Sequence, residues 1–517
     1  MDLEQTLRAH LIATLTRPPA PGDSALLPDG VDWVELRADV AGEPEPRVAD
    51  ALARELAGGL VYTLRSRAEG GAGPDDPARR AERLVLAGAR ASLYALVDLE
   101  ADRDLHPEVL EAIPPERRLL SWHGPASSVA AIEERIEAMT RTPARLYKLV
   151  IAAAQPGEEL APLLALAAAG RRDVVAFASG QAGAWTRLVA PRLGAPVAYG
   201  AFPGEDPAAP GQPGVDRLVA DYGLPELPPV EALYGIVGRP VIHSLSPRLH
   251  NRAYRALGIH ALYLPFHAER FGDFWLEVVE DGRLAELGLP LRGLSVTSPY
   301  KEAALAVAGA PSPRAQVVAA ANTLIETDGV WEAESTDPEG VVLPLRRLGV
   351  ELAGLPVAVV GAGGAGRSAV VGLKEAGARV TLVNRSEERG RQVAADLGVA
   401  FAPLAGFGAG AELESFGVVV HATTLGRDPS DPLPFDPGRL RAAAVLVDLV
   451  YLEGETPLLA AARAAGRRAV DGREVLIYQA LEQFRLMTGR ELPIAVAREA
   501  LGLPPDGEPR ETEAGEG

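Results

Sequence analysis

The stretch PVAVVGAGGAGRSAVVGLKEAGARVTLVNRS, residues 356–386, decides the fold of the second half of the chain. It reads as a buried strand, a glycine-rich turn, a helix and a second buried strand. The turn holds Gly361, Gly363 and Gly366 in the spacing G-x-G-x-x-G. Glycines with this spacing let the backbone approach a pyrophosphate at the N-terminus of the following helix. The stretch therefore predicts a βαβ unit that binds a dinucleotide.

The residues after the second strand indicate which dinucleotide this is. The strand ends in Asn384-Arg385-Ser386, at the place where an acidic residue would hold the ribose 2′-hydroxyl of NAD. An acidic residue would repel a 2′-phosphate, whereas Arg385 and Arg389, one helical turn apart, would attract it. We expect NADP(H); the alternative is a dinucleotide-binding domain with degenerate adenosine contacts.

The composition of the whole chain excludes several kinds of protein. Its 517 residues suggest about three domains, or one barrel of about 250 residues joined to a two-lobed partner. The net charge of −19, from 51 basic and 70 acidic residues, argues against nucleic acid as a partner. There is no cysteine, which excludes disulfides and thiol nucleophiles.

Targeting and metal-binding signals are also missing from the sequence. No uncharged apolar run reaches about 18 residues, and the N-terminus lacks the pattern of a signal peptide. The eight histidines show no ligand-like spacing with carboxylates. We therefore expect a cytoplasmic protein with small-molecule substrates, no bound metal and no membrane partner; the oligomeric state stays open.

Lysine is scarce in this chain. Only Lys148, Lys301 and Lys374 occur among the 51 basic residues, so arginine supplies nearly every generic positive charge. Arginine is always protonated, whereas lysine can lose its proton, form a Schiff base or transfer a proton. Each lysine is thus a candidate for chemistry, although chance retention on the surface is the alternative. Lys374 lies in the helical pattern AVVGLKEAGAR and is the one we expect to be structural.

The first half of the chain alternates short apolar segments with helix-like stretches. This pattern is typical of parallel strands with crossover helices, and eight such units suggest a closed (β/α)8 barrel. A doubly wound sheet is the competing interpretation. The eight apolar segments are residues 11–15, 33–36, 60–64, 93–97, 119–122, 146–151, 174–178 and 196–198.

Charged residues interrupt these apolar segments near their ends. In WVELRAD, Glu35 and Arg37 are two apart and share one face of a strand. Arg65 ends the next strand, and Glu69 follows in a glycine-rich loop. Charges at the carboxyl ends of barrel strands indicate a site, and a structural ion pair at the rim is the alternative.

Two further residues point to catalysis. His123 follows a strand in LLSWHG, and Lys148 lies inside the apolar strand LYKLVIAA. Burial of a lysine lowers its pKa and makes a neutral, nucleophilic amine available. A histidine at the end of the preceding strand favours catalysis over an edge-strand lysine.

At this point the first half resembles the type I 3-dehydroquinate dehydratases. The motifs ELRAD, TLR…EGG, SWH, YKLVIAA, GQAGAWTR and AAPGQ occur in this order and cover about residues 8–215. The resemblance implies a (β/α)8 barrel in which Lys148 forms the imine, His123 is the general acid and base, and Glu69 orients the histidine. It also implies a set of groups that bind the substrate's hydroxyls and carboxylate: Glu35, Arg37, Arg65, Arg187 and Gln212.

Three positions of the first half depart from this family. Ser179 stands where methionine is usual, Ala208 where serine is usual, and Tyr199 where phenylalanine is usual. We expect them to affect efficiency more than reaction type.

Downstream of a Pro-rich linker, a second set of motifs spans residues 232–490. HSLSPRLHN, VTSPYK, AANTLI, STDPEG, VDLVY and LIYQALEQF each read alone as common turns, caps or helices. Together they resemble the shikimate dehydrogenases, whose substrate-binding α/β domain and NADP-binding domain are completed by a C-terminal helix. The resemblance implies that Lys301 and Asp337 are the catalytic pair.

The same resemblance assigns the remaining site residues. The substrate-binding residues would be Ser244, Ser246, Thr297, Asn322, Tyr451, Gln479 and Gln483. The cofactor-binding residues would be Gly361, Ala362, Gly363, Gly364, Ala365, Gly366, Asn384, Arg385, Ser386, Arg389, Thr423 and Gly472. Departures from the family are Ser295 and Ser335, where asparagine is usual, and HATT at 421–424, where a run like NATS is typical.

Both resemblances together imply a bifunctional enzyme that converts 3-dehydroquinate to shikimate with NADPH. Channelling between the halves is a hypothesis motivated by the single chain. Rival interpretations are a catabolic quinate/shikimate dehydrogenase that uses NAD, a sensor without turnover, and a class I aldolase in the barrel. The expected boundaries are 1–224 for the barrel, 225–232 for the linker, 233–343 for the substrate domain, 344–472 for the NADP domain, 473–503 for C-terminal helices and 504–517 for a disordered tail.

Overall fold

The computed structural model describes residues 7–125, 127–407, 413–428, 430–452 and 454–504. The chain divides into two compact units. The first comprises Met1–Leu233, Pro240–Pro247 and Gly258–Leu291, and the second comprises Tyr234–Arg239, Arg248–Leu257 and Arg292–Gly517. The expected disordered tail lies, from residue 505 on, outside the described residues. No helix of the described residues is long and apolar enough to cross a membrane.

The eight apolar segments of the first half form eight parallel strands in one nearly closed barrel. The strand order, β8-β7-β6-β5-β4-β3-β2-β9, places chain neighbours side by side, so the doubly wound alternative is wrong for this half. The strands are β2 (His10–Leu15), β3 (Val31–Arg37), β4 (Gly59–Thr63), β5 (Tyr94–Glu100), β6 (Arg118–Pro125), β7 (Leu146–Ala152), β8 (Val174–Ser179) and β9 (Val197–Ala201).

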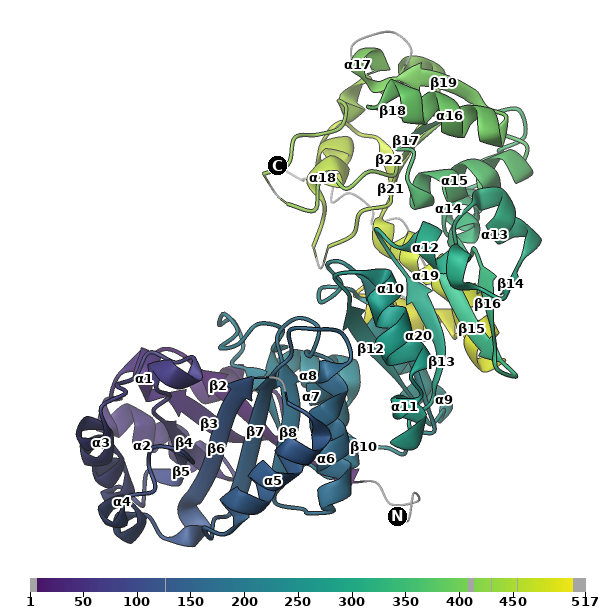
Figure 1. Ribbon diagram of the computed structural model, residues 1–517. Coiled ribbons are helices and arrows are strands. Elements are labelled where there is room, and N and C mark those ends of the chain that lie inside the picture. Colours follow the sequence, from purple (N-terminus) through teal and green to yellow (C-terminus); the bar gives the residue numbers. More distant parts are fainter. Residues whose placement is uncertain (1–6, 126, 408–412, 429, 453, 505–517) are drawn as a thin grey trace, which may run out of the picture. The chain divides into compact units, whose positions relative to one another are not determined.

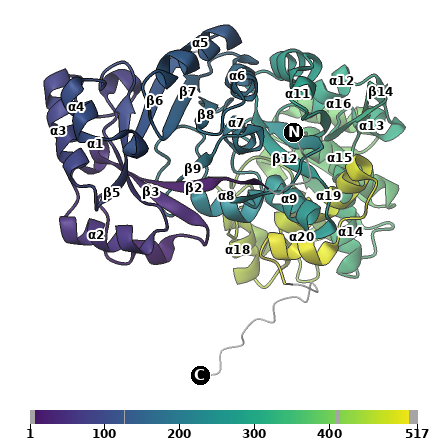
Figure 2. The same ribbon diagram turned by 90° about the horizontal axis from the view of Figure 1, so that it is seen from below.

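Helices follow the barrel strands and lie outside them, as Figures 1 and 2 show for α3, α4 and α5. Their starts follow from local sequence: Asp76 caps α3, with Pro77 in its first turn, and Ser128 caps α5. The helices are α1 (Ala38–Ala41), α2 (Pro46–Glu55), α3 (Pro77–Ala89), α4 (Pro107–Ala112), α5 (Val129–Thr140), α6 (Ala161–Ala169), α7 (Thr186–Val189) and α8 (Val215–Tyr222).

The segment expected to be a Pro-rich linker contains a strand. In it, β10 (Glu226–Leu227) pairs antiparallel with β1 (Leu7–Arg8). The first unit continues with β12 (Ala261–His267), α10 (Phe271–Phe274), a π-helical turn over Trp275–Glu280, and α11 (Arg283–Glu286). The domain boundaries expected from the sequence stay a prediction.

The second unit begins with a mixed sheet. In it β11, β13, β15, β16 and β14 lie side by side in this order, with antiparallel pairs β13–β15 and β15–β16 and a parallel pair β14–β16. The strands are β11 (Ala232–Gly238), β13 (Leu291–Val296), β14 (Ala310–Pro311), β15 (Thr323–Thr327) and β16 (Val330–Glu334). The helices that accompany them are α9 (Ser246–Leu257), α12 (Lys301–Val307), α13 (Pro313–Val318) and α14 (Asp337–Arg347).

A parallel six-stranded sheet follows, in the order β19-β18-β17-β20-β21-β22. The order reverses between β17 and β20, which is where doubly wound sheets bind ligands. The strands are β17 (Pro356–Val360), β18 (Arg379–Asn384), β19 (Ala400–Pro403), β20 (Val418–His421), β21 (Val445–Asp448) and β22 (Arg468–Val470). The helices are α15 (Gly364–Glu375), α16 (Glu387–Leu397), α17 (Leu404–Phe407), α18 (Pro457–Ala464), α19 (Gly472–Thr488) and α20 (Ile494–Ala500).

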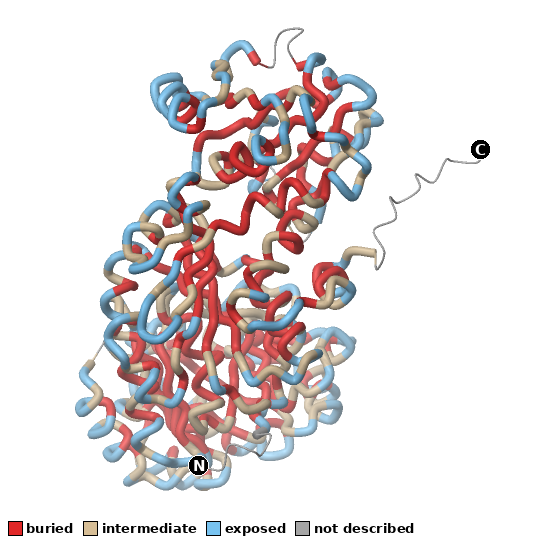
Figure 3. The backbone as a smooth tube through the Cα atoms, turned by 90° about the vertical axis from the view of Figure 1, so that its right-hand side faces the viewer, coloured by how far each residue is buried: buried red, intermediate tan, exposed pale blue. Residues whose placement is uncertain are grey.

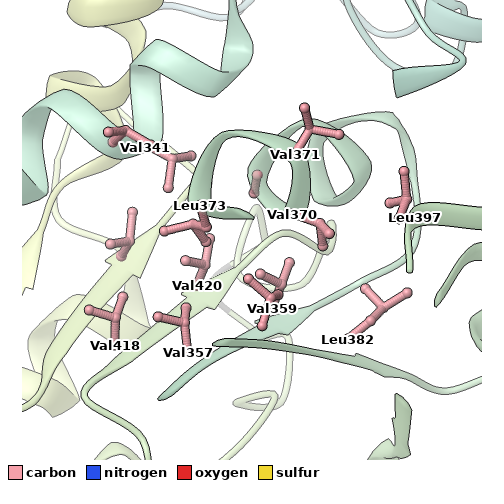
Figure 4. Packing of buried hydrophobic residues seen from close by; sticks show 14 of the residues in the cluster. Val341, Val357, Val359, Val370, Val371, Leu373, Leu382, Leu397, Val418 and Val420 are labelled. Atoms are coloured by element: carbon pink, nitrogen blue, oxygen red, sulfur yellow. The ribbon is translucent and has the colours of Figure 1, made fainter. Parts of the chain in front are cut away.

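Both faces of this sheet are buried, as its continuous apolar runs predict. On one face Val359 and Val420 pack beneath Val370 and Leu373 of α15 (Figure 4), and on the other Val360 and Val419 pack with Phe407. Figure 3 shows that buried segments follow the strands, whereas exposed segments follow loops and outer helical turns. A sheet fixed on both faces holds its carboxyl edge, and the residues on it, in place.

Candidate active sites

A cavity of about 560 Å³ lies within the barrel and gathers the residues predicted from the first half. Strand ends supply most of them, as expected for the carboxyl face of a (β/α)8 barrel. His123 lies within β6 rather than after a strand, because β6 extends to Pro125. The eight predicted residues that line the cavity are Glu35, Arg37, Arg65, Glu69, His123, Lys148, Arg187 and Gln212.

Lys148 is buried and only loosely paired. Its Nζ lies 3.8 Å from Oε1 of Glu35 and 4.1 Å from the centre of the Tyr199 ring. Burial lowers the pKa of Lys148, because the ammonium loses its hydration and the attraction of Glu35 offsets only part of this. A loosely paired, desolvated amine is suited to act as a nucleophile.

Glu35 remains a carboxylate beside this lysine. Thr14 and Thr63 each donate a hydrogen bond of 2.9 Å to it. Burial alone would raise the pKa of Glu35, but the charges of Lys148 and Arg37 outweigh that effect and lower it. Sequence reasoning missed both threonines. They could have been found as hydroxyl residues inside or at the end of an apolar strand, where a buried hydroxyl needs a hydrogen-bond partner.

His123 and Glu69 form a pair in the same cavity. Nδ1 of His123 lies 3.0 Å from Oε2 of Glu69, and the backbone N–H of His123 donates to the same oxygen over 3.2 Å. Burial, together with the charges of Arg65 and Lys148, lowers the pKa of His123 well below its usual value. Burial raises the pKa of Glu69 to about 7. An ionised Glu69 can therefore hold a neutral imidazole in one tautomer.

The arginines of the cavity differ in how many of their N–H groups already donate to other protein groups. Arg65 donates to Glu69 over 3.0 Å, to Asp98 over 2.5 Å and to Ser121 over 2.9 Å. Arg37 makes a bidentate ion pair of 2.9 and 2.8 Å with Asp39. The sequence did not single out these carboxylates, which occupy arginines expected to bind substrate.

Arg187 and Gln212 instead keep free hydrogen-bonding atoms. Arg187 lies 4.4 Å from the centre of the Phe177 ring, and its burial lowers its pKa to about 10. Gln212 donates to Thr14 over 3.2 Å. Among the described residues, Nε of Arg187 and Oε1 of Gln212 are buried without a hydrogen-bond partner. An unpaired buried donor and acceptor in one cavity indicate a ligand that supplies both complements.

The departures noted in the first half all line this cavity. Ser179 donates a weak hydrogen bond of 3.3 Å to the carbonyl of Ile151, and Ala208 contributes only a methyl group. Tyr199 is buried against Lys148, and its hydroxyl has no partner among the described residues. None of the three removes a charged group from the cavity.

The predicted catalytic pair of the second half is formed in the structure. Lys301 donates to Oδ2 of Asp337, and Asn322 donates to Oδ1 of the same carboxylate over 2.8 Å. The hydroxyl of Ser368 in α15, which the sequence did not suggest, lies 3.4 Å from Oδ2 and 3.0 Å from the carbonyl oxygen of Gly364. A Cβ at Gly364 would lie 3.1 Å from Cδ of Lys301, so the lysine stem passes close to the glycine-rich turn. The ammonium thus lies beside the predicted dinucleotide site.

Another predicted residue of the second unit, Gln483, is linked to this pair through Asn322. Gln483 is buried, donates to the carbonyl of Asn322 over 3.3 Å and accepts from Ser295 over 3.1 Å. The Ser295 departure therefore keeps a polar link. Ser335 is buried, with its hydroxyl 3.4 Å from that of Ser368. The remaining predicted residues, Thr297, Tyr451 and Gln479, are half-buried.

Ser244 and Ser246 belong to the first compact unit and are buried. The backbone N–H of Ser246, the first residue of α9, donates to the hydroxyl of Ser244 over 3.2 Å. Arg217 of α8 donates to the carbonyls of Ile242 and Ser244 over 3.0 and 3.4 Å. These contacts fix the turn that holds the two serines.

The glycine-rich turn fits a dinucleotide pyrophosphate. Gly361 has a φ of +120°, which favours glycine. A Cβ at Gly366 would lie 1.9 Å from the carbonyl oxygen of Gly361, so there is no room for a side chain at Gly366. Space is open around Gly363, and no described side chain caps the N-terminus of α15. Uncapped N–H groups at a helix N-terminus favour an anion. The other residues of the turn, Ala362, Gly364 and Ala365, complete the same loop.

The adenosine and nicotinamide sides of the predicted cofactor site contain different groups. At the end of β18, Asn384 accepts from the backbone of Ala362 over 3.2 Å, and Arg385 and Ser386 are exposed. Arg389 is exposed and pairs with Glu302 over 3.2 Å. Thr423 follows β20, and Gly472 begins α19. Within the described residues, no group of three or more His, Asp or Glu side chains could hold a metal ion.

Three family models match the chain. They are type I 3-dehydroquinase over residues 24–226, the shikimate dehydrogenase substrate binding domain over 236–324, and the shikimate 5′-dehydrogenase C-terminal domain over 472–501. Together they cover most of the barrel and both ends of the second half.

Curated relatives match either the second half or nearly the whole chain. The NADP(+) shikimate dehydrogenase of Methanothrix thermoacetophila is 38% identical over 275 residues, which are 52% of this chain and 98% of that protein. That of Acidiphilium cryptum is 41% identical over 257 residues, 50% of this chain and 90% of that protein. The chloroplastic bifunctional 3-dehydroquinate dehydratase/shikimate dehydrogenase of Arabidopsis thaliana is 27% identical over 489 residues, 90% of this chain and 79% of that protein.

Proposed function

The chain belongs to the shikimate dehydrogenase family and carries a type I 3-dehydroquinase domain before it, and we propose that it catalyses two consecutive reactions. The first dehydrates 3-dehydroquinate to 3-dehydroshikimate in the barrel. The second reduces 3-dehydroshikimate to shikimate with NADPH in the second half. Both are steps of the shikimate pathway, which leads to chorismate and the aromatic amino acids.

One observation carries this proposal: a single cavity contains a desolvated lysine, a neutral histidine and a carboxylate that orients the histidine. A sensor without turnover would have no use for this combination. A class I aldolase would share Lys148 but not the motifs of the second half.

The barrel reaction follows from these groups. The neutral amine of Lys148 attacks the C3 ketone of 3-dehydroquinate, and loss of water gives an imine that acts as an electron sink. Neutral His123, held by Glu69, removes the acidified C2 proton and passes a proton to the departing C1 hydroxyl, which leaves as water. Hydrolysis of the imine then releases 3-dehydroshikimate and the free lysine.

The polar atoms that remain unpaired in the cavity are suited to the substrate's other groups. Arg187 can offer a fork of N–H donors to the carboxylate, and Gln212 an acceptor to a hydroxyl. Glu35, Arg37 and Arg65 shape the polar wall around them. Because protein carboxylates already hold Arg37 and Arg65, we assign the substrate carboxylate to Arg187.

The reduction uses the second lysine differently. Bound NADPH supplies a hydride to the ketone of 3-dehydroshikimate. Lys301, held by Asp337 and Asn322, supplies the proton that the resulting alkoxide needs and stabilises its negative charge. In the second unit, Thr297, Tyr451, Gln479 and Gln483 are the residues proposed to contact the substrate; the roles of Ser244 and Ser246 stay predictions from the family resemblance.

We propose NADP(H) as the cofactor, with its pyrophosphate at the glycine-rich turn and its 2′-phosphate near Arg385 and Arg389. The relatives from Methanothrix and Acidiphilium are both named NADP(+) enzymes. A catabolic enzyme that prefers NAD is the rival, and rates with NAD and NADP compared on one preparation decide between them. A cytoplasmic location stays a prediction, because the Arabidopsis relative is named chloroplastic.

Borohydride trapping tests the proposal most directly. Treatment of the chain with 3-dehydroquinate and borohydride should leave a reduced adduct on Lys148, located by mass mapping of peptides. Lys148→Ala should abolish the adduct. An adduct on Lys301 or Lys374, or none in a preparation that still dehydrates the substrate, would contradict the imine mechanism.

A further inference from the structure

A buried chain of three polar side chains lies at the carboxyl edge of the parallel sheet. His421 ends β20 and pairs in register with Asp448, which ends β21. Nδ1 of His421 lies 2.9 Å from Oδ1 of Asp448, and Nε2 lies 2.6 Å from the hydroxyl of Thr423. The side chains of His421 and Asp448 are 0% and 1% exposed, whereas Thr423 is half-buried. These three hydrogen-bonded side chains therefore lead from the core toward the surface, which they reach at Thr423.

The donors around Asp448 decide where the histidine carries its proton. Asp448 accepts from the hydroxyl of Thr456 over 2.6 Å and from the backbone N–H of Val450 over 3.1 Å. A carboxylate that accepts at both oxygens cannot donate, so Nδ1 of His421 is the donor between them. We take the ring as neutral, and a neutral ring with its proton at Nδ1 has only a lone pair at Nε2.

The hydroxyl of Thr423 consequently gives its single proton to His421. The same oxygen accepts from the backbone N–H of Leu425 over 3.2 Å. A hydroxyl has one proton and two lone pairs, so one lone pair remains. Thr423 can therefore offer a ligand an acceptor but no donor.

The position of Thr423 indicates which part of the cofactor would contact its hydroxyl. Val360 at the end of β17 pairs in register with His421, so the glycine-rich turn and Thr423 flank the point where the strand order reverses. A Cβ at Gly361 would lie 3.2 Å from Cγ2 of Thr423. With a pyrophosphate at the turn and the adenosine over β18, the nicotinamide half lies toward β20.

We propose that His421, held by Asp448, is a positioning residue that fixes the hydroxyl of Thr423 as an acceptor for the carboxamide N–H of nicotinamide. The carboxamide nitrogen is the one group on that half of the cofactor that only donates, so it matches a site that only accepts. Pyrophosphate oxygens, which only accept, are mismatched. The inference deepens the proposed dehydrogenase function and rests on it.

The test compares NADP⁺ with its 3-acetylpyridine analogue, in which a methyl ketone replaces the carboxamide and no N–H remains. Dissociation constants come from calorimetry on the full chain without substrate. Thr423→Val should weaken NADP⁺ binding about 3–10-fold, the usual cost of one neutral hydrogen bond, and analogue binding less than about 2-fold. Thr423→Ser, which keeps the hydroxyl, should restore both.

Thr456→Val is the matched control, because it removes a hydroxyl that donates to Oδ2 of Asp448, whereas Oδ1 keeps its contacts with His421 and with the backbone N–H of Val450. It should leave the ratio of the two dissociation constants unchanged. An equal loss for both ligands in Thr423→Val, no loss for either, or an equal change of the ratio in Thr456→Val would overturn the proposal. A wild-type chain that neither binds NADP⁺ nor oxidises shikimate would overturn the proposed function instead.

A double-mutant cycle tests the part played by His421. If the ring acts through Thr423, His421→Leu should add no further loss of NADP⁺ affinity to Thr423→Val. Losses that multiply would show that the ring acts only by packing and would overturn its positioning role. Should His421→Leu fail to fold, the same cycle with the polar His421→Asn decides.

Discussion

The two active sites of this chain use the same side chain in opposite surroundings. Lys148, 8% exposed, has its nearest carboxylate oxygen at 3.8 Å and an aromatic ring against it. Lys301, 13% exposed, is hydrogen-bonded directly to Asp337, whose other oxygen accepts from Asn322. Burial in the barrel disfavours the charged form of Lys148, which suits the nucleophile that we propose, whereas the direct contact of Lys301 with Asp337 suits the proposed proton donor. If the two proposed mechanisms hold, the distance from the amine to its nearest carboxylate distinguishes the covalent catalyst from the acid catalyst.

Replacement of Lys148 by arginine should give the largest effect. A guanidinium keeps the charge but cannot form the imine, because its pKa stays far above neutral pH. Dehydratase kcat should fall by at least about 10³-fold, as expected when a covalent catalyst is removed. Shikimate oxidation by the same preparation should stay within about 2-fold of wild type, which also controls for folding of the second half.

Lys301→Arg should have the reciprocal effect, with a smaller loss. Arginine can still stabilise the alkoxide but cannot readily give up a proton, so shikimate dehydrogenase kcat should fall by about 10²-fold or more. Dehydration of 3-dehydroquinate should be unchanged.

The third lysine provides the matched control for both replacements. Lys374 lies near the end of α15, away from the glycine-rich turn at its start, and donates to the carbonyl of Leu397. It lies outside both proposed sites. Lys374→Arg should therefore leave both activities within about 2-fold. A large loss in this variant would mean that general arginine substitution, not chemistry, explains the other two.

The next largest effect that we expect is a loss of dehydratase activity at acidic pH. Burial raises the pKa of Glu69 to about 7, so it is protonated below and ionised above that pH. Only the ionised form accepts the Nδ1 proton of His123, and dehydratase kcat/KM should therefore fall about tenfold per pH unit below 7. Because the pKa of His123 lies well below its usual value, its own protonation does not produce this limb.

Glu69→Gln should lower the rate and remove the acidic limb. Glu159 is the control, because burial raises its pKa to about 7 as well but it does not line the cavity. Glu159→Gln should keep the limb. A limb that survives in Glu69→Gln would assign it to deprotonation of Lys148 instead.

The structure brings the residues predicted for the barrel site into one cavity, and topology explains why. Parallel strands deliver their carboxyl ends to one face, so any charged residue found there converges on the same cavity. Eight strands and the position of His123 could be found in this way. Lys148 stood out because lysine is scarce and this one lies in an apolar strand, and the role of Glu69 followed from the family resemblance. The spacing of its glycines located the glycine-rich turn, and the shikimate dehydrogenase motifs supplied the pair of Lys301 and Asp337.

The sequence could not predict which carboxylates pair with which arginines. Asp39 lies in the ELRAD motif, two residues after Arg37, and Asp98 lies in a segment without a distinctive motif; neither position signals that the carboxylate pairs with Arg37 or Arg65. Which carboxylate pairs with an arginine depends on the rotamers that both side chains adopt in the packed structure, and strand periodicity does not encode these rotamers. The β10 strand inside the Pro-rich linker escaped for a related reason, since its partner β1 lies more than two hundred residues earlier.

Cofactor selectivity should give the smallest effect. Arg385 is exposed, and Arg389 already pairs with Glu302 over 3.2 Å. Arg385→Ala should raise KM for NADPH about tenfold, the cost of a lost charge-assisted hydrogen bond, and leave KM for NADH nearly unchanged. Arg389→Ala should have a weaker effect, because that guanidinium must exchange a carboxylate for the phosphate.

Arg391 supplies the control on the same helix. It pairs with Glu387 one turn away and has no role in the proposed site. Arg391→Ala should leave both KM values unchanged, whereas a general loss of positive potential would raise KM for NADPH equally in all three variants. An equal increase would mean that charge near α16 acts at long range, and higher salt would then weaken NADPH binding in each variant alike. Only a loss specific to Arg385, and absent with NADH, is consistent with direct recognition of the 2′-phosphate.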